Sequence, residues 1–70
     1  MSERVECHSG YRYAERPAAL WWEEQRLEIT EVETQWRSPG GPSFRVRVQD
    51  GRRFELFYGE HEDEWRINPI

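Results

Sequence analysis

The sequence predicts an all-β fold, a small antiparallel meander of four to five strands curled toward an SH3-like barrel. Residues 44–48 and 54–58 alternate apolar and polar side chains with the period of a half-buried strand. Turn-forming residues, Ser-Pro-Gly-Gly-Pro-Ser and Asp-Gly, stand before each of these stretches. Helical spacing of apolar residues is nearly absent, so the alternation determines the predicted fold class.

The 70-residue length predicts one domain over 1–70, in which residues 1–15 form a first strand or a covering segment. Cys7 is the only cysteine, so no intrachain disulfide can stabilise the fold. Four Trp, three Tyr and three Phe can supply a small core instead. This aromatic content sets the chain apart from disordered sequences, despite a mean hydropathy of −1.07.

Charge and hydropathy limit the classes of protein and partner. The N-terminus has no apolar signal segment and no later run has the length of a membrane span, so we expect a cytoplasmic protein without a membrane partner. All ten basic residues are arginine, a usage compatible with a GC-rich genome and a thermophilic source. Because lysine is absent, Schiff-base and P-loop chemistry are excluded.

The Asp-Gly pair after residue 49 is typical of a two-residue hairpin loop. Such a loop would set Val48 opposite Arg53 and mix core and solvent faces. A three-residue loop over 49–51 instead pairs Val46 with Phe54 and keeps apolar side chains together. We therefore predict the three-residue loop, with its glycine in a left-handed conformation.

The strand before the Pro-Gly breaker changes its apolar phase. Leu27 and Ile29 occupy odd positions, whereas Val32 and Trp36 occupy even ones. This slip predicts a β-bulge or sharp bend near residues 30–31, as closure of a small barrel requires. A tight turn at Glu24-Gln25 and an acidic turn after Gly59 complete the predicted sheet. Its other pairs are Trp22 with Leu27, Leu20 with Ile29, Trp36 with Phe44, Thr34 with Val46, Val32 with Val48, Trp65 with Tyr58 and Ile67 with Leu56.

The adjacent residues Trp21 and Trp22 cannot both enter one core, because neighbours in a strand point to opposite faces. We expect Trp22 to lie inside, as do Trp36 and Trp65, and Trp21 to lie outside. An outward tryptophan is a good anchor for a protein partner or a nucleic-acid base. The alternative is that the N-terminal segment, with tyrosines in residues 11–13, folds over Trp21.

Phe57 also points outward and is the second candidate binding residue, in an aromatic patch with Trp21. The alternative for Phe57 is stacking on its cross-strand neighbour Arg66. Arg52 and Arg53 would add phosphate contacts if this face bound single-stranded nucleic acid. The net charge of −4 disfavours such a partner, and solvated side chains are the alternative for both arginines.

Two ion pairs across neighbouring strands are expected, Glu33 with Arg47 and Arg45 with Glu55. Exposed pairs of this kind contribute only about 0–1 kcal/mol each. These ion pairs would nevertheless engage arginines that could otherwise bind phosphate. This expectation favours a surface network of charges over a nucleic-acid site.

Metal and catalytic chemistry find little support in the sequence. Cys7, His8 and His61 lack the spacing of a zinc site, and the acidic turn after Gly59 lacks the ligand order of a calcium loop. One cysteine and two histidines form no persuasive set of nucleophile, base and orienting group. We therefore expect no catalytic residue, no metal and no cofactor.

A pattern of core residues runs through most of the chain, from Arg16 to Ile67. Its members are Trp22, Arg26, Val32, Trp36, Leu56, Trp65 and Ile67. This pattern resembles a small bacterial domain family of unknown function. Members of that family occur near, or fused to, genes for translesion DNA polymerases, so the resemblance implies an accessory role in DNA repair and no catalytic residues.

The sequence thus predicts a non-enzymatic protein-interaction or accessory module. The face around Trp21 and Phe57 would dock a protein partner or mediate self-association. The alternative is a single-stranded nucleic-acid-binding module with a DNA-repair accessory role. It would use the same aromatic side chains together with Arg52 and Arg53.

Overall fold

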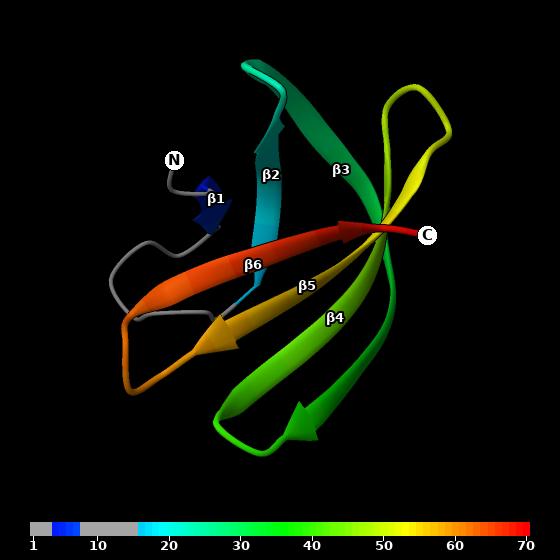
Figure 1. The fold of residues 1–70 in the computed structure, drawn as a ribbon. Coiled ribbons are helices and arrows are strands. Elements are labelled where there is room, and N and C mark those ends of the chain that lie inside the picture. The colour runs from blue at the N-terminus through cyan, green and yellow to red at the C-terminus, as the bar shows by residue number, and fades with distance from the viewer. Residues whose placement is uncertain (1–3, 8–15) are drawn as a thin grey trace.

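A computed structural model describes residues 4–7 and 16–70, and every regular element in those ranges is a β-strand (Figure 1). The strands are β1 (Arg4–Cys7), β2 (Pro17–Trp22), β3 (Gln25–Ser38), β4 (Gly41–Val48), β5 (Arg53–Gly59) and β6 (Glu64–Pro69). Each strand pairs antiparallel with its successor, in the sheet order β1-β2-β3-β4-β5-β6. The predicted all-β meander is confirmed, and β1 lies within residues 1–15, for which the sequence predicts a first strand or a covering segment. The described residues contain no helix with the length and hydropathy needed to cross a bilayer.

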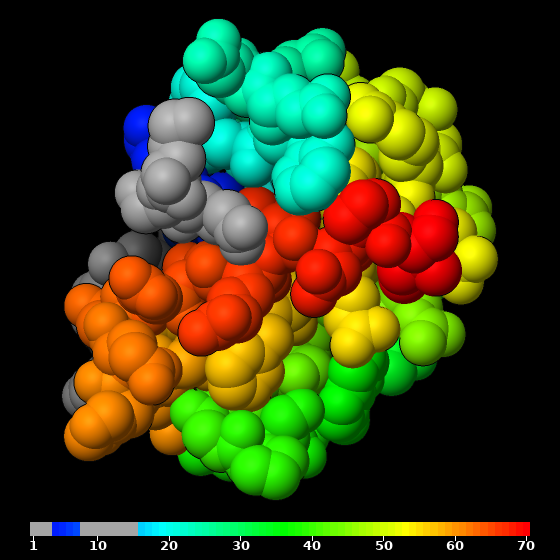
Figure 2. All heavy atoms as spheres, in the orientation of Figure 1, coloured from blue at the N-terminus to red at the C-terminus, as the bar shows by residue number. Residues whose placement is uncertain are grey.

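The long strand β3 joins two halves of the sheet, as Figure 1 shows. Its start pairs with β2, and from Ile29 onward it pairs with β4. The register shifts between Ile29 and Glu31, where the sequence predicts a bulge, and shifts again between Val32 and Thr34. These irregularities let the sheet curl into a half-barrel. In the view of Figure 2, β6 crosses the front of the molecule.

The concave face of the half-barrel holds the core. Trp22 on β2 meets Phe54 on β5 across the interior, with ring centroids 5.5 Å apart. Trp65 packs against Phe44 and Tyr58 at 5.9 and 5.1 Å. Such ring pairs add about 0.5–1.5 kcal/mol beyond the burial of their area. The buried cluster consists of Leu20, Leu27, Phe44, Val46, Val48, Phe54, Leu56 and Ile67.

The β4–β5 hairpin has the predicted register. Val46 pairs with Phe54, and Val48 N–H donates to the carbonyl of Arg52 at 2.9 Å, which leaves a three-residue loop. Gly51 within this loop has φ +93°, the left-handed conformation that glycine adopts without steric cost. The predicted pairing of β5 with β6, Tyr58 opposite Trp65, is also present.

The β2–β3 turn differs from the prediction. It consists of Glu23 and Glu24, both with positive φ (51° and 67°), as in a type I′ hairpin turn. Leu20 therefore pairs with Leu27 rather than with Ile29. The predicted register of β2 against β3 is wrong by two residues, so every side chain remains on its predicted face. Trp22 accordingly packs against the core, although it is half-buried rather than fully enclosed.

The β3–β4 turn overturns the predicted position of Trp36. A two-residue Pro39-Gly40 loop sets Ser38 opposite Gly41, so Trp36 pairs with Ser43 and not with Phe44. This error is one residue, and a slip of one moves a side chain to the other face. Trp36 therefore lies half-buried on the outer face of the sheet and does not pack against the core cluster.

Candidate interaction surfaces

The outer side of β1, β2 and the start of β3 forms the first candidate surface, the Trp21 face. It consists of Arg4, Glu6, Ala19, Trp21, Arg26 and Glu28, which the strand register brings together. The guanidinium carbon of Arg4 lies 4.8 Å from the centroid of the Trp21 ring, a cation–π contact. The indole Nε1–H of Trp21 donates to Glu6 Oε2 at 3.3 Å. The half-buried Trp21 side chain thus has partners on the neighbouring strand of its own chain.

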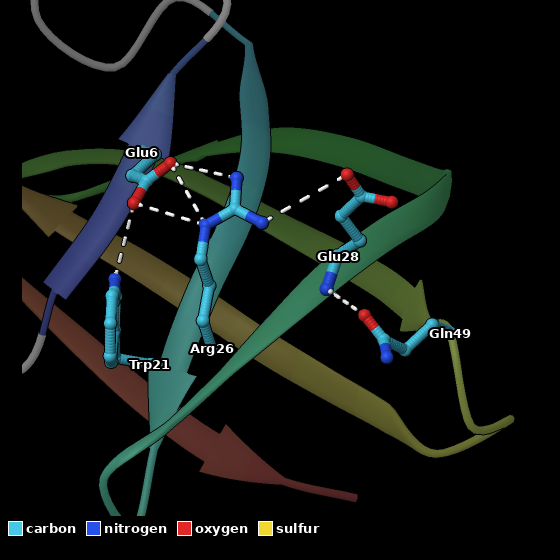
Figure 3. Close-up of polar contacts among 5 residues, drawn as sticks. All are labelled: Glu6, Trp21, Arg26, Glu28 and Gln49. Atoms are coloured by element: carbon cyan, nitrogen blue, oxygen red, sulfur yellow. Dashed lines mark hydrogen bonds and ion pairs between the residues drawn. The ribbon is translucent and has the colours of Figure 1, made fainter.

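Glu6 is the centre of the polar contacts on the Trp21 face, between Trp21 and Arg26 (Figure 3). Arg26 Nη2 donates to Glu6 Oε1 at 3.0 Å, and Arg26 Nε contacts both carboxylate oxygens at 3.3 Å. The hydrogen bonds from Arg26, and then that from Trp21, lower the pKa of the Glu6 carboxyl below its ordinary value. The carboxylate is therefore charged at neutral pH and joins β1 to β2 and β3.

The Trp21 face also contacts the β4–β5 loop. The backbone N–H of Glu28 donates to the side-chain oxygen of Gln49 at 2.8 Å, as Figure 3 shows, and Gln49 N–H donates to the carbonyl of Glu28 at 2.9 Å. These bonds connect the start of β3 to the loop beyond β4. The predicted covering of Trp21 by residues 11–13 lies outside the described residues.

The outer side of β3–β6 forms the second candidate surface, the Phe57 face. Its members are Trp36, Ser43, Arg45, Glu55, Phe57 and Arg66, which share one side of the sheet because they pair directly or alternate along a strand. Ser43 stands between Trp36 and Phe57 in register and is only 3% exposed, although it faces away from the core. The two flanking rings therefore cover it. Its hydroxyl is hydrogen-bonded to that of Ser38, with the oxygens 2.7 Å apart.

Small residues surround the ring of Phe57. A Cβ atom added to Gly40 would stand 3.3 Å from Phe57 Cζ, and one added to Gly59 would stand 3.5 Å from Cε2. Gly41 lies still closer to its neighbour, since a Cβ atom there would be 1.8 Å from the carbonyl oxygen of Tyr58. The Phe57 face is thus built on a close approach of the β3–β4 turn to the end of β5.

The charged residues of the Phe57 face make no ion pairs among the described residues. Arg45 stands opposite Glu55 as predicted, but no ion pair joins them or involves Arg66 within the described part of the chain. The Nε of Arg45 is buried and has no hydrogen-bond partner. A buried donor left without a partner costs about 1–3 kcal/mol, more when charged. Because this Nε is buried, an acceptor from outside the chain can bond Arg45 only through its terminal guanidinium nitrogens.

The two arginines predicted for nucleic acid are both paired with carboxylates. Arg52 donates to Asp50 at 2.8 Å and lies over the Phe54 ring at 5.7 Å. Arg53 shares Glu33 with Arg47, at 3.0 and 2.9 Å respectively. The hydrogen bond from Arg53 is the main cause that lowers the pKa of Glu33.

The predicted Glu33–Arg47 ion pair is thus present, although Glu31 rather than Glu33 is the cross-strand partner of Arg47. Glu33 lies at the second register shift of β3, and its side chain is only 16% exposed. It holds two arginines of neighbouring strands together. Backbone and side-chain hydrogen bonds from Arg52 likewise lower the pKa of Asp50.

The structure does not bring the predicted binding residues together. Trp21 on β2 and Phe57 on β5 are separated by two strands, and none of the ring contacts among the described residues joins them. The outer neighbour of Phe57 is instead Trp36, across Ser43. Sequence reasoning missed Trp36 as a surface residue, and the Pro-Gly pair at 39–40 was the signal for the tight turn that turns it outward.

Within the described residues, no three His, Cys, Asp or Glu side chains are grouped so as to hold a metal ion. The carboxyls with lowered pKa are all bonded to arginines on the surface. This is the pattern of structural ion pairs.

No protein-family model, curated protein or solved structure matches this chain. The resemblance to a bacterial domain family therefore stays a prediction.

Proposed function

We propose that this protein is a non-enzymatic interaction module that docks a protein partner on the Phe57 face. The observation that carries the proposal is the burial of Ser43 on the outer side of the sheet, between two half-buried aromatic rings. Aromatic side chains beside arginine are enriched at the energetic centres of protein interfaces. The Arg45 side chain supports the same surface, because it makes no ion pair among the described residues and its terminal guanidinium nitrogens can bond a partner's carboxylate.

Trp21 is a weaker anchor than the sequence suggests. Its ring and its indole N–H are engaged by Arg4 and Glu6, so a partner would have to displace contacts within the chain. Trp36 and Phe57 face no such competition from a described strand. We therefore centre the docking surface on β4 and β5, where Phe57 keeps the role predicted for it.

The nucleic-acid alternative has less support. Phosphates would have to replace Asp50 at Arg52 and Glu33 at Arg53. The net charge of −4 opposes the approach of a polyanion. The accessory role in DNA repair that the resemblance implies would then act through a protein contact.

A photoreactive amino acid tests the proposal in cells that produce the protein. Placed at exposed Asn68, which shares a row with Glu55 on the Phe57 face, it should form a protein adduct. Placed at exposed Glu28 on the Trp21 face, the same group should not. Phe57→Ser should abolish the adduct at position 68. Adducts from position 28 alone would contradict the proposal.

A titration with labelled single-stranded DNA at physiological salt completes the test. We expect at most weak binding, because the described arginines that flank the sheet are largely paired with carboxylates. Sub-micromolar binding that is lost in Arg52→Ala or Arg53→Ala would favour the nucleic-acid alternative.

A further inference from the structure

The Phe57 face carries both signs of charge in unpaired form. The two cations, Arg45 and Arg66, and the anion, Glu55, make no ion pair with any described residue. A surface that binds its own copy through a twofold axis must contain both members of every contact. Unpaired charges of both signs beside aromatic side chains meet that requirement, whereas a purely basic or acidic partner would satisfy only one sign.

The strand register arranges the Phe57 face in rows. One row across β3–β6 reads Trp36, Ser43, Phe57 and Arg66, and the next reads Thr34, Arg45, Glu55 and Asn68. A twofold axis that lies in the contact plane, between β4 and β5 and parallel to them, lays β4 over β5 of a second copy. The same rotation lays β3 over β6. Each residue then faces a residue of the same row in the second copy, with β4 opposite β5 and β3 opposite β6.

We propose that the occupant of the Phe57 face is a second copy of this chain, related by this twofold axis; the inference rests on the proposed protein-binding function. In this arrangement Arg45 faces Glu55 of the second copy. Phe57 of the second copy comes to the position of Ser43 and so packs against the two rings that cover it. Trp36 faces Arg66 of the second copy, a pairing suited to a cation–π contact.

The next row limits the contact. Arg47 and Arg53 would face each other there, and Glu33 neutralises part of their charge within each chain. This row therefore marks the edge of the interface rather than its centre. Association would also enlarge the buried apolar area of a 70-residue domain, which small domains without disulfides often require.

Charge exchange at Arg45 and Glu55 tests the inference by sedimentation velocity. The wild-type chain should be a dimer at about 100 µM. R45E and E55R, each alone, should raise the dissociation constant more than about a hundredfold, because like charges then meet twice per dimer. R37E is the matched control, since Arg37 is paired with Glu60 and is not in either row, and it should remain dimeric.

Mixing the two single variants separates contacts between chains from contacts within one chain. Arg45 and Glu55 are also neighbours in the same sheet. In each single variant, the like charges at positions 45 and 55 of one chain repel each other, and this repulsion is the same whether the variant is alone or mixed. Only a contact between copies predicts that R45E and E55R, monomeric alone, form a heterodimer when mixed. Failure of the mixture to associate would overturn the inference.

Two further outcomes would also overturn it. A monomeric wild-type chain would exclude a second copy as the occupant. In that case, an adduct between position 68 and a different protein would still support the proposed protein-binding function. A dimer that persists in both single variants would place the interface elsewhere. If R45E or E55R does not fold, as judged by its thermal transition, R45Q and E55Q should each weaken the dimer at least tenfold, and unchanged dimers would contradict the proposal.

Discussion

The Trp21 face and the Phe57 face are both outer surfaces of one sheet, yet they differ in how their aromatic residues are engaged. On the first, Arg4 and Glu6 of β1 occupy the ring and the indole N–H of Trp21. On the second, Phe57 and Trp36 cover only a serine, and Arg45 retains a buried donor without a partner. An outward aromatic residue is therefore no sufficient sign of a binding site. What matters is whether the chain itself satisfies that residue and its neighbours.

The largest expected effect concerns the backbone beneath the Phe57 face. Gly41→Ala would place a Cβ atom 1.8 Å from the carbonyl oxygen of Tyr58, so β4 and the end of β5 must separate. We expect a loss of about 3 kcal/mol or more in the free energy of unfolding, measured by chemical denaturation. Gly51→Ala is the control: its Cβ would meet nothing within 4 Å, and only its left-handed φ should cost about 1–2 kcal/mol. Equal losses would show that the close approach is not required.

A smaller effect is expected on the Trp21 face. Trp21→Ala removes the ring beneath Arg4 and the donor to Glu6, and should lower the free energy of unfolding by about 2 kcal/mol, roughly half the cost for a fully buried ring. Amide hydrogen exchange should accelerate in β1 and change little in β4 and β5. Trp36→Ala is the matched control, and it should leave β1 protected. Faster exchange in β1 of both variants would contradict the conclusion that Trp21, and not Trp36, holds β1 in place.

The smallest effect is the pH dependence of the Glu6 contacts. Because its pKa is lowered in the folded chain, Glu6 stabilises the fold at pH values above the unfolded pKa of about 4.3. This contribution is lost as the pH falls through the folded pKa. In Glu6→Gln, the free energy of unfolding should depend less on pH in this range. The substitution should lower the free energy of unfolding by only a fraction of the loss expected for Trp21→Ala. The Trp21 indole N–H signal follows the titration. A signal that titrates identically in Glu6→Gln would assign the pH dependence to another group.

The sequence predicted the faces of most strands correctly because alternation survives errors of two residues. The β2–β3 turn shows this, since Leu20 pairs with Leu27 instead of Ile29 without a change of face. Trp36 shows the opposite case, because a Pro-Gly loop and a second bulge near Glu33 shift its register by one. An apolar pattern does not reveal a bulge at a polar residue, so the placement of Trp36 and Phe57 on either side of Ser43 required the structure.

Side-chain pairing on the surface was predictable only in part. The Glu33–Arg47 ion pair was predicted, although Glu33 reaches Arg47 from a register shift and is not its cross-strand partner. The Glu6 contacts depend on β1, whose place beside β2 no pattern in the sequence specifies. Arg45 and Glu55 face each other as expected, yet their charged groups do not meet within the chain. Register decides which residues are neighbours, but rotamers and competing partners decide which of them bond.

The most direct test of the central claim, that the Phe57 face rather than the Trp21 face is the interaction surface, is a dilution series followed by the tryptophan indole N–H signals in NMR spectra. The two outer tryptophans report on one face each. We predict that the Trp36 signal shifts or broadens as the protein concentration rises, while the Trp21 signal, held by Glu6, stays unchanged. A concentration-dependent Trp21 signal beside an invariant Trp36 signal would contradict this account.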